Sequence, residues 1–233
     1  MCSSDLYNNN RAFRTSPGGI GSPGEIADSL DARRIMDELK YSDTYPWPLG
    51  ADGSGATLAK VHPATGSAHP ASWVASVQIN GTPGIVNLFP PTPALALNEV
   101  AASIDPNFQI EIYNRGGASV LLGGMVLASS NPAHPDYPLP ASTLNSGEFL
   151  AIDAATLGYT PDDNNRLFLF SAGASTLVDT VRIDNFPQAR FPDGSGRWFR
   201  PDNATFGNEN SVVLRNDIVI NEVFYHAYPQ RAS

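Results

Sequence analysis

Several ingredients of common protein classes are scarce in this chain of 233 residues. Cys2 is the single cysteine, so a framework of disulfide bonds is excluded. Lysine occurs only as Lys40 and Lys60, and the formal net charge is −9. With no basic cluster either, the charge pattern argues against binding to nucleic acid or to an anionic membrane. No apolar run approaches the roughly 20 residues of a membrane-spanning helix, so we expect no membrane insertion.

Glycine and proline, in contrast, are abundant. The chain holds 20 of each, and 42% of its residues are hydrophobic, which indicates a packed core interrupted by many turns. Its apolar segments are short, and several alternate: Ile110 and Ile112 occupy one face of a strand that has Glu111 on the other. We therefore predict an all-β sandwich over residues 93–212, with no helix longer than two turns. Its predicted inward-facing residues include Ile110, Ile112, Leu127, Leu150, Leu167 and Val181.

One strand-like phrase occurs twice. Residues 97–100 read LNEV and residues 220–223 read INEV. Three more phrases recur in the same order: IMDELKY and LVDTVRI, then DGSG twice, then GTPGIVN and ATFGNEN. Chance rarely places four landmarks in one order, so we predict tandem repeat units. This match predicts a strand at residues 35–41, although the apolar spacing across residues 23–39 also suits a helix.

The repeat divides the chain into three parts. Residues 1–92 are predicted to be the closing part of a first unit, residues 93–212 a complete unit, and residues 213–233 the first strand of a further unit. Between DGSG and the next Asn-Glu pair, the first copy has an insertion of about 18 residues, which we expect in a loop within residues 56–80. Residues 1–6 can be read as translated sequencing adapter or as an ordinary disordered terminus; with the first reading, we expect the chain to be a fragment of a longer protein.

The landmarks of residues 93–212 together resemble the lamin-tail domain family. The matching segments are Asn98-Glu99-Val100, Ile110 to Asn114, Leu122 to Leu127, Arg190 to Gly194, and Thr205, Gly207 and Asn210 of the closing phrase. Phe206 departs from the proline usual in that family, and Gly124 stands where a larger residue is expected. The resemblance implies an immunoglobulin-like β-sandwich. It also implies a non-catalytic module, repeated in tandem, in a large secreted or surface protein of bacteria.

The polar residues of these landmarks are the candidate site. We interpret them as structural motif residues: Asn98, Glu99, Glu111, Asn114, Asp193, Gly194, Asn210, Asn221 and Glu222. Glu99 is the sharpest anomaly, because acidic residues are rare inside strands of a sandwich. We expect its carboxylate to accept backbone N–H bonds or to pair with an arginine such as Arg115. A metal site would need further oxygen ligands close by.

Other chemistries find little support. The loops PDDNN (161–165) and PDGSG (192–196) suit tight turns better than calcium, because no calcium-loop spacing is present. GIGSPG (19–24) fits the dinucleotide pattern, but Pro23 lacks an N–H for a phosphate and no apolar strand precedes it. The remaining candidates are four scattered histidines without zinc spacing and two serines without a nucleophile elbow: His62, His69, His134 and His226, and Ser54 and Ser195. We predict no catalytic residue, no cofactor and no metal.

The predicted function is structural: spacing, display or adhesion, at an extracellular or cell-surface location, with a protein or a glycan as partner. One alternative is an accessory region of a secreted enzyme whose nuclease, phosphatase or kinase-like domain lies elsewhere. A second is a carbohydrate-binding module, since Trp47, Trp73, Trp198 and Tyr137 have rings that stack on sugars, although core packing is their commoner use. The first unit lacks its opening strands, so we expect residues 1–92 to be poorly ordered alone. Residues 217–226 carry the phrase that would supply the missing strand.

Overall fold

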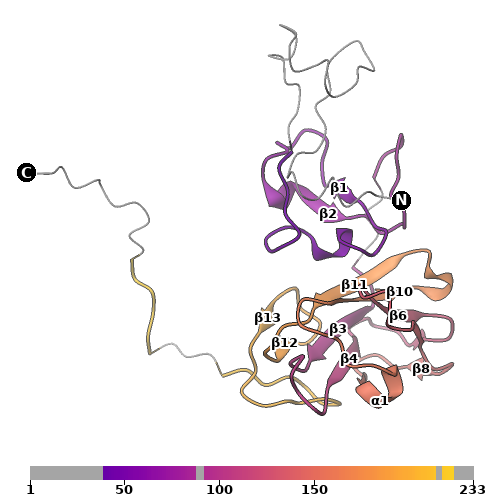
Figure 1. The fold of residues 1–233 in the computed structure, drawn as a ribbon. Coiled ribbons are helices and arrows are strands. Elements are labelled where there is room, and N and C mark those ends of the chain that lie inside the picture. Colours follow the sequence, from indigo (N-terminus) through magenta and orange to yellow (C-terminus); the bar gives the residue numbers. More distant parts are fainter. Residues whose placement is uncertain (1–38, 88–91, 214–216, 223–233) are drawn as a thin grey trace, which may run out of the picture.

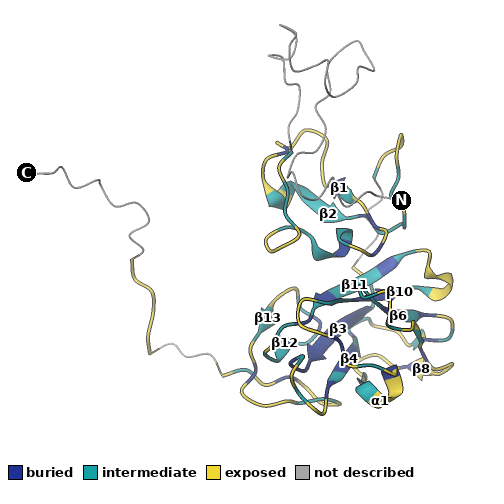
Figure 2. Ribbon diagram, viewed as in Figure 1, coloured by how far each residue is buried: buried dark blue, intermediate teal, exposed yellow. Residues whose placement is uncertain are grey.

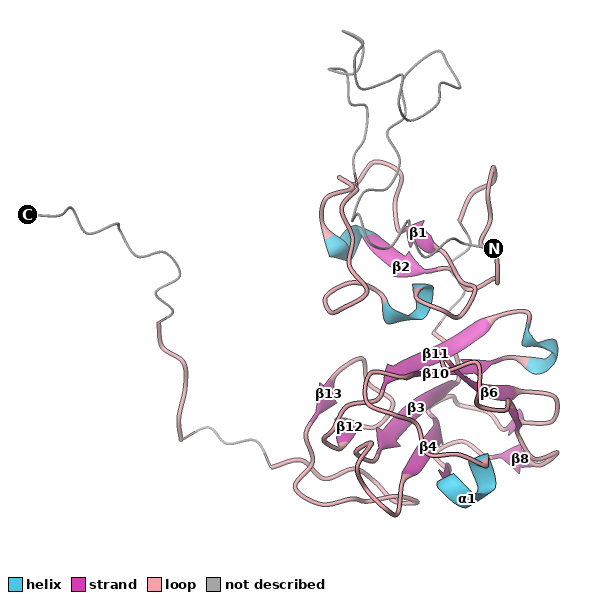
Figure 3. Ribbon diagram, viewed as in Figure 1, coloured by secondary structure: helices cyan, strands magenta, loops and turns pink. Residues whose placement is uncertain are grey.

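The computed structural model describes residues 39–87, 92–213 and 217–222. Almost all regular structure there is antiparallel β-sheet (Figure 3). The strands are β1 (Leu58–Lys60), β2 (Trp73–Ala75), β3 (Leu95–Val100), β4 (Gln109–Asn114), β5 (Val120–Leu121), β6 (Val126–Ser129), β7 (Tyr137–Pro138), β8 (Thr143–Leu144), β9 (Phe149–Asp153), β10 (Arg166–Phe170), β11 (Leu177–Arg182), β12 (Gln188–Arg190) and β13 (Trp198–Phe199). The helical pieces are α1 (Ala154–Leu157) and three 3₁₀ turns at Leu49–Ala51, Pro70–Ser72 and Ala172–Ala174. The all-β prediction is confirmed, and no described helix is long and apolar enough to cross a membrane.

Residues 92–213 form two main sheets that share one hydrophobic core. The larger has the order β13-β12-β3-β4-β9 and the smaller the order β11-β10-β6-β7; β5 and β8 make a separate pair (Figure 1). Successive side chains of a strand point to opposite faces, so every second residue points into the space between the sheets, and these residues are mostly apolar. Five of the predicted inward-facing residues are buried in this core: Ile110, Ile112, Leu127, Leu167 and Val181. Leu150, on the edge strand β9, is half-buried and packs against it.

The outer face of the smaller sheet is covered as well. Residues 166–170 read RLFLF, with Leu167 and Leu169 in the main core and Phe168 and Phe170 on the opposite face. The two phenylalanines pack in a second cluster with Ala56 and other residues of the 39–87 segment. A strand buried on both faces is apolar throughout, which accounts for this unbroken run.

The 39–87 segment folds around the hairpin of β1 and β2 and lies against β11 (Figure 1). Residues 77–79 run beside the start of β11: the Leu177 N–H donates to the Val77 carbonyl at 2.8 Å, and the Ile79 N–H donates to the Ser175 carbonyl at 3.2 Å. Gly50 also approaches β11 closely, because a Cβ there would lie 2.7 Å from the Leu177 side chain. The segment thereby covers part of a sheet edge that would otherwise be open.

The two ends of the described chain depart from the predicted strands. Residues 217–222 form no strand and are exposed, whereas β3 and β4 are largely buried (Figure 2). Near the other end, Leu39 makes a single β-bridge, and residues 40 and 41 lie outside any strand. The strand predicted at residues 35–41 is therefore wrong for its last two residues, and residues 35–38 fall outside the described part. Residues 1–6, the helix considered before residue 39, and residues 223–226 also fall outside the described part.

Candidate functional site

A β-bulge in β3 explains the phrase LNEV. Leu97 pairs with Ile112, while the next pair along the ladder is Glu99 with Glu111, so Asn98 is an extra residue on its strand. A bulge of this kind puts two consecutive residues on one face. Leu97 and Val100 accordingly point into the core, and Asn98 and Glu99 both point to the opposite face, beside Glu111. All three polar side chains are fully buried.

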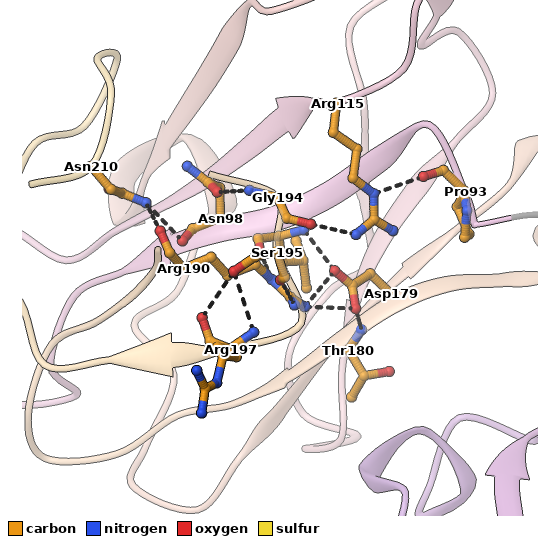
Figure 4. A network of polar contacts seen from close by, with 11 residues as sticks. Pro93, Asn98, Arg115, Asp179, Thr180, Arg190, Gly194, Ser195, Arg197 and Asn210 are labelled. Carbon is orange, nitrogen blue, oxygen red and sulfur yellow. Dashed lines mark hydrogen bonds and ion pairs between the residues drawn. The ribbon is translucent and has the colours of Figure 1, made fainter. Parts of the chain in front are cut away.

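The Asn98 amide connects β3, β4 and the turn at residues 192–196. Its Nδ2 donates to Glu111 Oε1 at 2.9 Å and to Asp193 Oδ1 at 2.8 Å. Its Oδ1 accepts from the Gly194 N–H at 2.7 Å (Figure 4). Gly194 has a φ of +65°, and a Cβ on it would lie 2.8 Å from the Arg115 Cβ. The turn thus needs glycine both for its conformation and for its close approach to β4.

The two glutamates hold the closing segment, residues 205–210, over the outer face of the larger sheet. Glu99 accepts from the Thr205 N–H at 3.0 and 3.1 Å and from the Thr205 hydroxyl at 2.9 Å. Glu111 accepts from the Gly207 N–H at 2.5 Å. The expectation of backbone N–H donors at Glu99 is therefore met, and pairing with Arg115 is not. Arg115 instead donates to the Pro93 and Gly194 carbonyls at 2.9 and 2.6 Å (Figure 4).

Asn210 closes the network. Its N–H donates to Asp193 Oδ1 at 3.1 Å, and its Nδ2 donates to the carbonyls of Arg190 at 3.0 Å and Asn98 at 3.3 Å. Its Oδ1 lies 2.8 Å from the Thr205 hydroxyl, whose one hydrogen is shared between this oxygen and Glu99 Oε2. Every oxygen of the carboxylates of Glu99, Glu111 and Asp193 thus receives a hydrogen bond from the chain itself.

Burial sets the charge state of this network. It raises the pKa of Glu111 to about 7, against the opposing effect of the bonds from Asn98 and Gly207, and the neighbouring carboxylates of Glu99 and Asp193 raise it further. Burial likewise raises the pKa of Glu99, partly offset by its bonds from Thr205. Both glutamates therefore lie where protonation is favoured more than in water.

Arg190 begins one of the matching segments but was not among the candidate site residues. This buried side chain, 6% exposed, donates from Nε to the Leu97 carbonyl at 2.7 Å and from Nη2 to Asp179 at 2.9 and 3.1 Å. It also donates to the Ser195 carbonyl and lies 4.5 Å from the Trp198 ring centroid. Asp179 in turn accepts from the Leu97 N–H at 3.0 Å.

This ion pair therefore joins the two sheets at the bulge, because Asp179 belongs to β11 and Arg190 to β12 (Figure 4). Burial lowers the pKa of Arg190, and the charge of Asp179 opposes that effect. The signal in the sequence was an acidic residue at an inner position of the apolar segment LVDTVRI. Its basic partner could not be identified without the register of the two sheets.

The structure brings together six of the nine candidate residues: Asn98, Glu99, Glu111, Asp193, Gly194 and Asn210. Asn114 has a separate role at the far end of β4, where its Nδ2 donates to the carbonyls of Ala118 and Leu144, both at 2.9 Å. Asn221 and Glu222 are exposed. Across the described ranges, no three His, Cys, Asp or Glu side chains are grouped to hold a metal ion.

The histidines and serines considered above serve local structure where they are described. His62 and His69 each accept, through Nδ1, the N–H two residues later, at 3.2 and 3.1 Å. His134 stacks on Tyr159 with ring centroids 4.1 Å apart. Ser54 accepts from the Ala56 N–H at 2.9 Å, and Ser195 accepts from the Arg197 N–H at 3.3 Å. His226 lies outside the described residues.

Contacts of the closing half recur in the 39–87 segment. Thr82 donates to Asn87 Oδ1 at 3.0 Å, as Thr205 does to Asn210. Asn87 Nδ2 donates to the Lys60 carbonyl at 2.9 Å, as Asn210 does to that of Arg190. Lys60 pairs with Trp73 across the hairpin, and its ammonium group lies over the tryptophan ring. Arg190 pairs with Trp198 in the same way, and its guanidinium group lies over that ring.

In these contacts the turn of Asp193 is matched by the loop between β1 and β2, since each connects a cation to the tryptophan that it pairs with. The match of the two DGSG phrases would instead place its counterpart at residues 52–55. Asp52 instead pairs with Arg166, and Ser54 bonds to the Gly50 carbonyl. The two identical tetrapeptides therefore have different surroundings, and the tandem repeat stays a prediction.

No family model matches the sequence, and no curated protein matches it. The resemblance to the lamin-tail family therefore stays a prediction.

Proposed function

We propose that this chain is a non-catalytic structural module of a larger extracellular or cell-surface protein, with an immunoglobulin-like sandwich as its unit. One observation carries the proposal: the buried carboxylates of Glu99 and Glu111 bind the chain's own closing segment. Buried charges directed at a reactant would leave oxygens open to it, whereas these serve to fasten the last part of the unit onto its first two strands.

We also propose that the units repeat in tandem, in the register of the recurring contacts. Three pairs are each 123 positions apart in the sequence: Thr82 and Thr205, Asn87 and Asn210, and Asn98 and Asn221. Asn87 and Lys60 are 27 positions apart, and Asn210 and Arg190 are 20 apart. The first copy thus carries seven extra residues, most of them in the loop between β1 and β2, in place of the 18 expected from the sequence.

A spacing function requires that neighbouring units do not move freely, and the packing of residues 39–87 against β10 and β11 supports this. The test is to unfold the full chain in urea and to measure the fluorescence of a single tryptophan in each variant. Trp73 reports on the first segment and Trp198 on the two-sheet body, with the other tryptophans changed to phenylalanine. We expect the two fluorescence transitions to share one midpoint in urea. Two well-separated midpoints would remove the rigid-spacer proposal.

A glycan-binding role has one specific observation in its favour. A groove of about 520 Å³ lies between the 39–87 segment and the two-sheet body. Tyr45, Trp198 and Phe199 line it together with Arg182, Asp184, Gln188 and Arg197. Aromatic rings next to polar groups suit a sugar ring, although Arg190 already covers one face of Trp198. A glycan array should use the full chain, because Tyr45 lies outside residues 93–212, and binding should be lost in Tyr45→Ala.

A further inference from the structure

The groove between the 39–87 segment and the two-sheet body has aromatic rings on both of its sides. Its volume of about 520 Å³ falls in the range of about 300–1,000 Å³ that small-molecule sites occupy. Tyr45 lines it from the first segment, and Trp198 and Phe199 of β13 line it from the body. Tyr45 is 89% exposed, which is unusual for so large a ring. Rings gathered in one depression favour a ligand with apolar faces of its own, such as a sugar ring.

The rings on the body side are held in place by packing beneath them. The guanidinium group of the buried Arg190 lies 4.5 Å from the Trp198 ring centroid and supports that ring on one face. The Phe199 ring meets the Phe191 ring at an angle of 87°, with centroids 6.3 Å apart. Ordering side chains during binding costs free energy, so rings that are already packed favour affinity for a ligand.

The charged residues of the groove carry a positive excess, although the net charge of the whole chain is −9. Arg182 and Arg197 line the groove together with Asp184. Arg182 Nη2 donates to Asp184 Oδ1 at 2.7 Å, and because a guanidinium group has five N–H groups, others are left to bind a ligand. Arg197 is exposed and adds a full positive charge, since arginine stays protonated. The groove therefore favours an anionic group over a neutral one.

The local backbone fixes where these polar groups lie. The Arg197 N–H donates to Ser195 Oγ at 3.3 Å, and the Arg197 carbonyl accepts from the Phe191 N–H at 3.3 Å. Gln188, which also lines the groove, donates from Nε2 to the Arg182 carbonyl at 2.9 Å. Its amide thus lies next to the arginines, and an amide both donates to and accepts from hydroxyl groups.

We propose that this groove binds an anionic sugar. The aromatic rings of Tyr45 and Trp198 contact the sugar ring. The guanidinium groups of Arg182 and Arg197 bind the carboxylate or sulfate group that the sugar carries. A guanidinium group donates two parallel hydrogen bonds to such an anion, whereas a neutral sugar offers it only weaker acceptors. The proposal rests on the glycan-binding role proposed above and adds the class of sugar.

The experiment applies the full chain to the glycan array with matched pairs of ligands. Oligosaccharides of uronic acids are compared with their methyl esters, and sulfated oligosaccharides with their desulfated forms. Each ligand that binds is then titrated by calorimetry beside its neutral form and beside inorganic sulfate. We expect the binding ligands to be acidic. Their neutral forms should bind about tenfold more weakly, because a charge-assisted hydrogen bond is lost, and inorganic sulfate, which has no ring to contact the aromatic side chains, should also bind more weakly.

Three exposed residues allow variants that leave the core intact. Arg197→Gln should weaken binding of the acidic sugar about tenfold and leave binding of its neutral form unchanged. Arg200→Gln is the matched control: it removes the same charge from an exposed arginine that lies over the Phe186 ring, 5.4 Å from its centroid, and it should leave binding unchanged. Tyr45→Ala should weaken binding of both forms. An unchanged midpoint of urea unfolding shows that each variant is folded.

Equal affinities for the acidic and neutral forms would overturn the proposal and leave the glycan-binding role standing. Equal losses in Arg197→Gln and Arg200→Gln would also overturn it, because they would show an effect of net charge alone. Inorganic sulfate bound as tightly as the sugar would indicate a site for a bare anion only. If no glycan binds, this proposal and the glycan-binding role both fail. The structural function would still stand, because coincident unfolding of the tryptophan reporters does not depend on a ligand.

Discussion

The two copies of the Asn-Glu strand have nearly the same sequence and opposite fates. Residues 95–100 form β3, and all six are buried at the centre of the larger sheet. Residues 218–222 carry the same pattern and are exposed, outside any strand. Strand propensity is therefore not the deciding factor, since the second copy has the more β-branched residues. What differs is whether a strand such as β4 and a closing segment such as residues 205–210 lie alongside.

The difference shows what stabilises the phrase. Its two aliphatic positions need an opposing sheet, and each buried leucine contributes about 1.5–3 kcal/mol relative to exposure. Its Asn and Glu need main-chain donors that the phrase itself does not contain. Placing those side chains in a sheet without the donors would cost about 1–3 kcal/mol for each unsatisfied group. The polar pair thus favours the strand only where a complete unit surrounds it.

The two copies should differ most in how much a substitution at an aliphatic position lowers the free energy of unfolding. Leu97→Asp places an unpaired charge in the main core, at a cost comparable to the whole stability of a domain, and we expect loss of cooperative folding. Ile220→Asp is the matched control and should change the free energy of unfolding by less than about 0.5 kcal/mol, because its side chain is exposed. Circular dichroism during urea unfolding measures both. A cooperative transition with an unchanged midpoint in Leu97→Asp would contradict the fold.

The ion pair at the bulge comes next. Arg190→Met leaves the half-buried Asp179 without its cation and removes the donor to the buried Leu97 carbonyl, so we expect a loss of about 3 kcal/mol. The matched change in the other hairpin, Lys60→Met, should cost less than about 1 kcal/mol, since Lys60 is only half-buried. Urea denaturation of both variants gives the values. Equal losses would show that the ion pair contributes nothing particular at β12.

Asn98→Ala is expected to have the third-largest effect. It removes two donors and one acceptor from the buried carboxylates and the turn, for a loss of about 2–3 kcal/mol. Asn221→Ala, at the corresponding exposed position, should leave the free energy of unfolding unchanged within about 0.5 kcal/mol. The same urea titrations compare the two directly. A similar, small effect at both positions would mean that the network does not hold the closing segment.

The fourth prediction concerns pH. The pKa of Glu111 is raised by burial to about 7, so its contribution to stability is fully present below the unfolded value near 4.5 and is lost as pH rises through 7. The free energy of unfolding should therefore fall between pH 5 and pH 8, with Glu99 adding to the trend in the same direction. Glu111→Gln should flatten this dependence, and Glu222→Gln should not. A slope that is unchanged in Glu111→Gln would contradict this assignment.

Sequence reasoning reached the fold class and most of the network, and it failed where the outcome depended on register. Alternation and short apolar segments were enough for the all-β fold and for Ile110 and Ile112 in the core. Polar residues inside strands marked Glu99 and Glu111. The bulge at Asn98 was hidden, because it exists only relative to the partner strand β4.

The pairing of Arg190 with Asp179 was hidden for a related reason, since it joins two different sheets. The repeat itself stays a prediction, and the similar contacts of Lys60 and Arg190 favour another register than the two DGSG phrases do. Turn sequences such as Asp-Gly recur wherever the backbone needs a positive φ, as at Gly53 and Gly194, so their identity carries little information about equivalence.

Amide hydrogen exchange at the two closing segments tests the central claim most directly. The claim is that an Asn-Glu strand and the donors of a closing segment bury each other, so that each is protected only where the other is present. In a dilute sample of the full chain, the amides of Thr205, Gly207 and Asn210 should exchange slowly, because they donate to buried or half-buried carboxylates. The amides of Thr82 and Gly84 should exchange at near-unprotected rates. The substitution Glu99→Gln should speed exchange at Thr205 and leave the rate at Thr82 unchanged. Equal rates at Thr82 and Thr205 in the unsubstituted chain would contradict the account.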